Sequence, residues 1–252
     1  MPQIAGLKRR EEDDGYAERI HPGGVPRGIL SLHQTRYEFA KPCCAGKIVL
    51  DVASGMGYGA YLLAEAARQV TGIDCDQATI EYAHRYYKRS NLTYLIGDAM
   101  ALPFPKASYE TVVSFETLEH LSDIPLFFSE VRRVLKPNGI YVVSTPKVRK
   151  TTSRPKNPHH TVEYSAEDFR VLLERYFSAA ELYGQIRVQN GFHYWLQKFD
   201  VFGFRHYLPA GIRYSIDRKL GTVPFEEMEI ADQRIVKGNL QRAHDLIAVC
   251  TR

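Results

Sequence analysis

Short apolar runs and helix-like segments alternate through the middle of this chain. Five runs rich in β-branched residues predict buried strands, each ending in polar residues or glycine. With the residues that end them, these runs are Ile48–Asp51, Val70–Asp74, Thr93–Ala99, Thr111–Glu116 and Ile140–Ser144. Segments with helical spacing of apolar residues lie between them, the clearest at Ile124–Leu135. The alternation predicts a parallel sheet with right-handed crossovers.

Further elements are predicted on both sides of this region. A helix is expected over Leu30–Phe39. Ser165 is expected to cap a helix over Ala166–Tyr176, with Asp168 as a weaker second partner of a capping box. Strands are predicted over Ala180–Val188 and Asp245–Thr251. The aromatic- and arginine-rich insertion between these two strands is longer than a usual connection, which favours a helical cap, a substrate lid or an interface.

The predicted fold class is therefore α/β. We expect a Rossmann-like, seven-stranded, mostly parallel sheet with helices on both faces, a helical lead-in and a long insertion before the last strand. All 252 residues should form one domain. Its expected parts are an N-terminal lid or helix (1–45), a cofactor-binding core (46–187), the insertion (188–244) and the last strand (245–252).

Composition narrows the class of protein without naming its activity. The net charge of +4 and the absence of any block of like charges argue against nucleic acid as a partner. No run of 18 uncharged apolar residues predicts a transmembrane helix, and no apolar signal region opens the sequence. The four cysteines have neither a disulfide nor a zinc spacing. A cytoplasmic location is expected.

A glycine-bearing loop follows the first predicted strand. In the segment from Asp51 to Gly59, glycine stands at alternate positions and a helix-like segment follows, which is typical of nucleotide sites but weak evidence by itself. Two later strand ends strengthen the interpretation. Asp74 lies about 20 residues beyond the loop, where a carboxylate can accept hydrogen bonds from ribose hydroxyls. Asp98 can accept from an exocyclic amine such as that of adenine.

These segments together resemble the class I S-adenosylmethionine-dependent methyltransferases, and more closely their type 11 domain. The resemblance covers roughly Gly46–Phe177 and rests on DVASGMGYG, GIDCD, GDAMALPF, SFETLEHL and RRVLKPNGIYVVSTP. One departure is Ala53, which stands where the family most often has glycine; we expect a slightly tighter fit there. A nicotinamide-binding Rossmann protein is the structural alternative, but it would carry G-x-G-x-x-G.

The resemblance implies S-adenosylmethionine as cofactor and S-adenosylhomocysteine as product. The loop would face the methionine portion of the cofactor, Asp74 the ribose, Asp98 the adenine amine, and Cys75 the adenine ring. Asp51 would orient the loop or meet the cofactor's amine through water, and Arg36 would bind the cofactor carboxylate unless it is a surface arginine. The expected cofactor-binding residues are Arg36, Asp51, Ala53, Ser54, Gly55, Gly57, Asp74, Cys75, Asp98, Ala99, Met100 and Phe115.

Three polar residues are candidates for the chemistry. Glu116 and His120 follow the fourth strand, and His160 lies in the loop after the fifth, which borders the transfer site in similar enzymes. A histidine titrates near neutrality and is a natural general base. His120 could instead be a capping or core residue, and His160 could brace its loop through Glu163. Because the spacing of the histidines is not diagnostic of a metal site, no metal ligand is predicted.

The predicted function is methyl transfer to a small-molecule or glycan acceptor, with O-methylation first. N- or C-methylation of a metabolite or a quinone-like ring is an alternative. A non-catalytic, cofactor-binding scaffold protein is an alternative of a different class. The sequence leaves a homodimer open.

Overall fold

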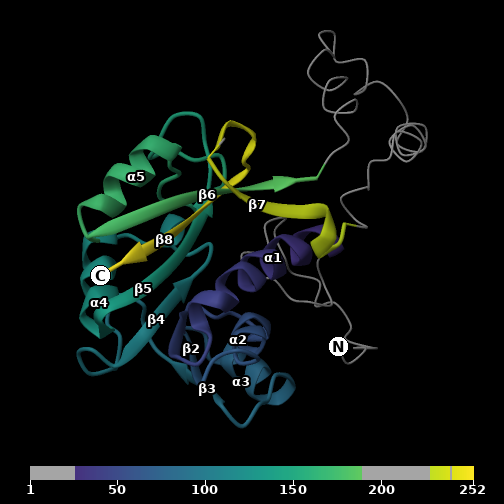
Figure 1. The fold of residues 1–252 in the computed structure, drawn as a ribbon, viewed down its shortest axis with the longest axis vertical. Coiled ribbons are helices and arrows are strands. Elements are labelled where there is room, and N and C mark those ends of the chain that lie inside the picture. The colour runs from purple at the N-terminus through teal and green to yellow at the C-terminus, as the bar shows by residue number, and fades with distance from the viewer. Residues whose placement is uncertain (1–25, 189–227, 239) are drawn as a thin grey trace.

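A mixed eight-stranded sheet runs through the centre of the molecule (Figure 1). The computed structural model describes residues 26–188, 228–238 and 240–252. The strand order is β3-β2-β1-β4-β5-β8-β6-β7. Neighbouring strands are parallel from β3 to β5 and antiparallel from β5 to β7. The strands are β1 Ile48–Val52, β2 Gln69–Asp74, β3 Leu92–Ile96, β4 Tyr109–Ser114, β5 Leu135–Pro146, β6 Ala179–Arg187, β7 Gln233–Lys237 and β8 Asp245–Thr251.

Helices cover both faces of the sheet, as the sequence predicted (Figure 1). They are α1 Arg27–Cys44, α2 Tyr58–Leu63, α3 Gln77–Tyr86, α4 Ile124–Val134 and α5 Ala166–Glu174, with 3-10 turns η1 Leu118–His120, η3 Ile230–Asp232 and η4 Leu240–Arg242. Successive strand residues point to opposite faces. Val49 packs in the core with α1, α2 and α3, whereas Leu50 packs in the core with α4 and α5. Both are fully buried, because helices cover each face of the strand.

The predicted strand count was one too low. The additional strand, β7, lies in the segment assigned to the 188–244 insertion, and it pairs antiparallel with β6. Only Gln233 of its five residues is buried. An edge strand this short and this exposed carries little apolar periodicity, so its sequence did not mark it as a strand. Residues 1–25 and 189–227, which include most of the predicted lid and insertion, lie outside the described residues.

Side chains cap the N-termini of α3 and α5. Asp76 caps α3, since its side chain accepts a hydrogen bond from the backbone N–H of Thr79 at 3.1 Å. Ser165 caps α5 by accepting from the N–H of Asp168 at 3.2 Å. The prediction that Asp168 completes a capping box was wrong. The N–H of Ser165 donates instead to the hydroxyl of Thr151 at 2.9 Å. Within the described residues, no helix is both long and apolar enough to cross a membrane.

Helix α1 packs across the start of α2 through Tyr37. A Cβ atom at Gly59 would lie 1.9 Å from the Tyr37 ring, so only glycine permits this approach. The Tyr37 hydroxyl lies 3.3 and 3.4 Å from the two carboxylate oxygens of Asp51, the fourth residue of β1. Asp51 is fully buried. Burial raises the pKa of Asp51 to about 8, with Asp74 adding to the rise and the Tyr37 hydrogen bond opposing it.

Replacing Asp51 with asparagine should stabilise the protein at pH 8 by more than about 1.4 kcal/mol, the equivalent of one pKa unit. The fold disfavours the charged carboxylate, so the wild type loses stability as pH rises from the unfolded pKa near 4 to the folded pKa of about 8. Asparagine cannot ionise and avoids this loss. Urea denaturation of both proteins at pH 5 and pH 8 measures the effect, with exposed Glu167→Gln as the control. Parallel stability curves for wild type and Asp51→Asn would contradict the assignment.

Candidate active site

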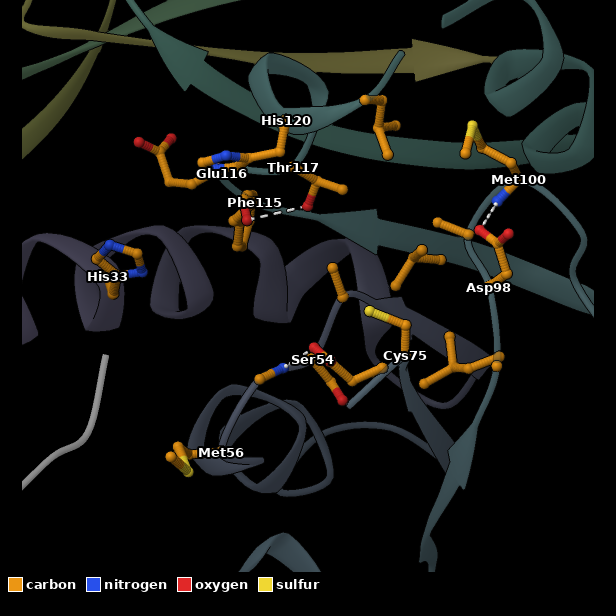
Figure 2. Close-up of a pocket in the computed structure, with 18 of the residues that line it drawn as sticks. His33, Ser54, Met56, Cys75, Asp98, Met100, Phe115, Glu116, Thr117 and His120 are labelled. Carbon is orange, nitrogen blue, oxygen red and sulfur yellow. Dashed lines mark hydrogen bonds between the residues drawn. The ribbon is translucent and has the colours of Figure 1, made fainter. Parts of the chain in front are cut away.

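A cavity of about 390 Å³ opens at the carboxyl ends of the parallel strands (Figure 2). It lies where the strand order reverses, because β2 and β4 flank β1 on opposite sides. Four strand-end segments and α1 contribute to its wall. The lining residues are His33, Tyr37, Val52, Ala53, Ser54, Gly55, Met56, Tyr58, Ile73, Asp74, Cys75, Gly97, Asp98, Ala99, Met100, Phe115, Glu116, Thr117, His120 and Leu121.

The loop after β1 forms one side of the cavity. Ala53 and Gly55 both have left-handed backbone conformations, with φ of 56° and 53°. A Cβ atom at Gly55 would meet nothing within 4 Å, so the backbone there borders open space into which a ligand can fit. Gly57 has a different role in the structure. A Cβ atom at Gly57 would lie 2.5 Å from the Cβ of Ala83, so this glycine allows α2 and α3 to pack.

The two predicted acidic residues face the same cavity. Asp74 is held by backbone donors: its Oδ2 accepts from the N–H of Gly55 at 3.0 Å and its Oδ1 from the N–H of Asp76 at 3.1 Å. Each carboxylate oxygen keeps a further lone pair for a ligand hydroxyl. Asp98 accepts from the N–H of Met100 at 2.8 Å (Figure 2). These bonds fix both carboxylates without using up their capacity to accept hydrogen bonds.

Arg36 is a buried residue of α1, so the surface-arginine alternative was wrong. Its Nη2 donates to Asp245 of β8, and its Nε donates to Oε1 of Gln185 at 2.8 Å. Its Nη1 is buried, makes no hydrogen bond within the described residues, and lies 3.5 Å from Oε1 of Glu116. Arg36 does not itself line the cavity; it lies behind Glu116, which does. Its cofactor role stays a prediction.

Glu116 sits in a constrained turn at the end of β4. Its φ is 50°, a left-handed value that is uncommon for a non-glycine residue. The hydroxyl of Ser144 donates to its Oε1 at 2.7 Å. Burial raises the pKa of Glu116, although Arg36 opposes the rise. Such strained turns cluster at functional sites.

The two predicted histidines touch each other but lie differently. His120 lines the cavity, whereas His160 packs edge-on against the His120 ring at a centroid distance of 4.9 Å. Nδ1 of His160 lies 2.7 Å from Oε1 of Glu163, so the bracing contact considered for this loop is present. Neither contact tests a catalytic role, which stays a prediction for both histidines.

The remaining predicted residues divide between the cavity wall and the layer behind it. Ala53, Ser54, Gly55, Cys75, Ala99, Met100 and Phe115 line the cavity, and Asp51, Gly57 and His160 do not. Sequence reasoning missed His33 and Tyr37, which reach the cavity from α1. Together with Arg36 they occupy one turn of that helix. The signal that could have identified them is their shared face: these polar side chains recur at helical spacing on the side of α1 that packs on the sheet.

Comparison with known proteins gives a consistent family assignment. Residues 50–143 match the family described as a methyltransferase domain. A probable S-adenosylmethionine-dependent methyltransferase of Mycolicibacterium smegmatis is 36% identical over 226 residues, which cover 87% of this chain and 83% of the relative. A fatty-acid O-methyltransferase of the same species is 34% identical over 159 residues, covering 56% of this chain and 57% of that relative.

A solved structure agrees on the fold. The SAM-dependent methyltransferase TM1293 of Thermotoga maritima, described as a possible histamine N-methyltransferase, has a TM-score of 0.61 at 14% identity. The match covers 89% of this chain and 93% of that one, and at this identity it shows the Rossmann-like fold alone. The family follows from the first relative, whose identity extends over most of both chains. The chain belongs to the class I S-adenosylmethionine-dependent methyltransferases, enzymes whose methyl donor is S-adenosylmethionine.

Proposed function

We propose that this enzyme methylates a hydroxyl oxygen of a small-molecule or glycan acceptor. The observation that carries the proposal is the shared cavity: Glu116, Thr117 and His120 line the same space as Asp74 and Asp98. A polar wall next to the cofactor suits an acceptor rich in hydroxyl groups. The name of the M. smegmatis fatty-acid O-methyltransferase also supports transfer to oxygen. The cytoplasmic location predicted from the sequence is kept as part of this proposal.

The cofactor would lie along the strand ends with its adenosine near Asp74 and Asp98. Its methionine portion would then follow the loop at Ala53 and Gly55, where the backbone leaves open space. Arg36 would act on its carboxylate through charge and not through a direct contact, because Arg36 lies behind Glu116 and does not line the cavity. In this orientation the sulfonium methyl would point toward Glu116 and His120, which line the cavity.

The reaction is a displacement at the methyl carbon. A lone pair of the acceptor oxygen forms the new C–O bond while the C–S bond breaks. The electron pair of the C–S bond stays on sulfur, which becomes a neutral thioether. The hydroxyl proton would pass to a base. Both Glu116 and His120 line the cavity, and we propose His120 because the Glu116 carboxylate already accepts from Ser144 and lies beside Arg36. Since the donor is already activated, holding the acceptor in line with the methyl group supplies much of the rate.

Asp74→Ala should weaken S-adenosylmethionine binding by on the order of 1.5–3 kcal/mol, the scale of hydrogen bonds to a charged group. Isothermal titration with S-adenosylmethionine and S-adenosylhomocysteine measures it. Asp74→Asn is the matched variant, because an amide oxygen can still accept from the N–H of Gly55. Wild-type affinity in a folded Asp74→Ala protein would refute the ribose role.

Mass spectrometry should detect a gain of one methyl group on hydroxyl-bearing acceptors when the enzyme is incubated with S-adenosylmethionine. The screen should pair each sugar or hydroxy acid with its amino analogue, because the two differ only in the attacking atom. Methylation confined to amines or to ring carbons would contradict transfer to oxygen. Cofactor binding without transfer to any acceptor would favour the scaffold alternative.

His120→Ala should lower turnover roughly 10²-fold or more and leave S-adenosylmethionine affinity nearly unchanged. The reason is positional: His120 lines the cavity, and in the proposed orientation it would border the transfer point while the predicted cofactor contacts lie elsewhere along the cavity. His159→Ala is the control, because its exposed side chain lies on the neighbouring loop and does not line the cavity. Full turnover by His120→Ala on the acceptor identified above would leave catalysis to proximity or to Glu116.

A further inference from the structure

Three potential ligand side chains converge behind the acceptor end of the cavity. Glu119 and His120 belong to η1 after β4, and His160 lies in the loop after β5. One ligand atom from each lies within 4.8 Å of the other two. The two segments are joined by the N–H of Thr161, which donates to the carbonyl of Glu119 at 2.6 Å. The convergence is therefore built into the backbone.

Glu119 is the unusual member of this group. It is 1% exposed, and its Oε2 accepts a hydrogen bond from the Thr145 hydroxyl at 3.1 Å. Its Oε1 is buried and has no hydrogen-bond partner in the described part of the chain. A buried oxygen in this position needs either a proton or a cation.

The hydrogen bonds of His160 identify its tautomer. Oδ1 of Asn157 accepts from the N–H of His159 at 3.0 Å, which fixes the orientation of the amide. The Asn157 NH₂ therefore faces Nε2 of His160, at 2.9 Å, and can only donate to it. Nε2 thus carries a lone pair, and Nδ1–H donates to Glu163.

His120 has a similar arrangement. Its Nδ1 lies 3.2 Å from the backbone carbonyl of His159, which can only accept a hydrogen bond. This contact fixes the proton on Nδ1 and directs the lone pair to Nε2. Metal-binding histidines are commonly oriented in this way, by a carbonyl or a carboxylate at the nitrogen that does not bind the metal.

From these contacts we infer that Glu119, His120 and His160 bind one divalent first-row transition-metal ion. Two imidazoles and one carboxylate suit zinc, manganese or iron, whereas magnesium and calcium prefer oxygen ligands alone. Ligand atoms lie about 2.0–2.2 Å from such an ion, so the three side chains close by roughly 1 Å on binding. The ion would be the partner that Oε1 of Glu119 lacks in the described residues, and it would take the place of the Asn157 donor at His160.

The catalytic consequence rests on the proposed function, whereas the binding of the ion does not. Because His120 lines the cavity, an ion bound to it would lie next to the space left for the acceptor. Such an ion would supply Lewis-acid chemistry: it would lower the pKa of a coordinated hydroxyl, whose proton would then leave to solvent. In the metal-bound enzyme His120 is then a ligand and no longer the base, and His120→Ala still loses turnover.

Titration of the metal-stripped full chain with Zn²⁺, Mn²⁺ or Co²⁺ alone tests the site. We expect one ion per chain, a raised melting temperature, and a Co²⁺ absorption spectrum typical of nitrogen and oxygen ligands. Glu119→Gln and His160→Ala should each weaken binding at least about 10-fold, and Glu163→Gln should weaken it about 10- to 100-fold by releasing His160. His159→Ala is the matched histidine control and should bind as the wild type does.

Each outcome separates this inference from the proposed function. Wild-type protein that binds no ion, or variants that bind as tightly as wild type, would overturn the metal site while methyl transfer stands. One bound ion lost in the variants, without methylation of any hydroxyl acceptor, would support the site and refute the proposed function. Circular dichroism of Glu119→Gln checks its folding, and His120→Gln replaces it if Glu119→Gln does not fold.

Discussion

The buried charge of Arg36 constrains the whole active-site end of the molecule. An unpaired guanidinium in the interior would cost several kcal/mol, so its partners must be in place for the fold to form. Those partners come from β6, from β8 and from the turn after β4. Burial opposes the ionisation of Asp245, but Arg36 and His244 outweigh it and hold the pKa of Asp245 well below the usual range. The ion pair between Arg36 and Asp245 fixes helix α1 to the sheet. It thereby also fixes His33 and Tyr37, the side chains of α1 that line the cavity.

Backbone strain at two adjacent strand ends completes the site. Ala53 after β1 and Glu116 after β4 both have positive φ, a conformation that costs an L-residue about 1–2 kcal/mol. At Ala53 the backbone keeps the conformation for which similar enzymes most often use glycine. At Glu116 the turn directs the side chain to Ser144 and toward Arg36. Strain at both positions is sustained by the packed sheet on either side of them.

The sequence predicted the parts of the fold that local patterns encode. The parallel strands, the loop after β1 and the positions of Asp74 and Asp98 follow from apolar runs that end in polar residues. The partners of Arg36 could not be predicted, because Gln185 and Asp245 lie 149 and 209 residues away along the chain. The cluster of Glu119 with His120 and His160 could not be predicted for the same reason, since His160 belongs to a different loop. Short β7 has too few buried residues to mark a strand.

The Arg36–Asp245 contact also has a consequence for the order of folding. Strand β8 lies between β5 and β6 in the sheet, although both precede it in the chain. During synthesis the sheet is therefore incomplete until residues 245–251 emerge, and until then Arg36 has no carboxylate from β8. Contacts this distant in sequence form late and slow the search for the native state. A nascent chain would carry the entire glycine loop long before β8 completes the sheet, and this topology would therefore expose unpaired strand edges to chaperones at that stage.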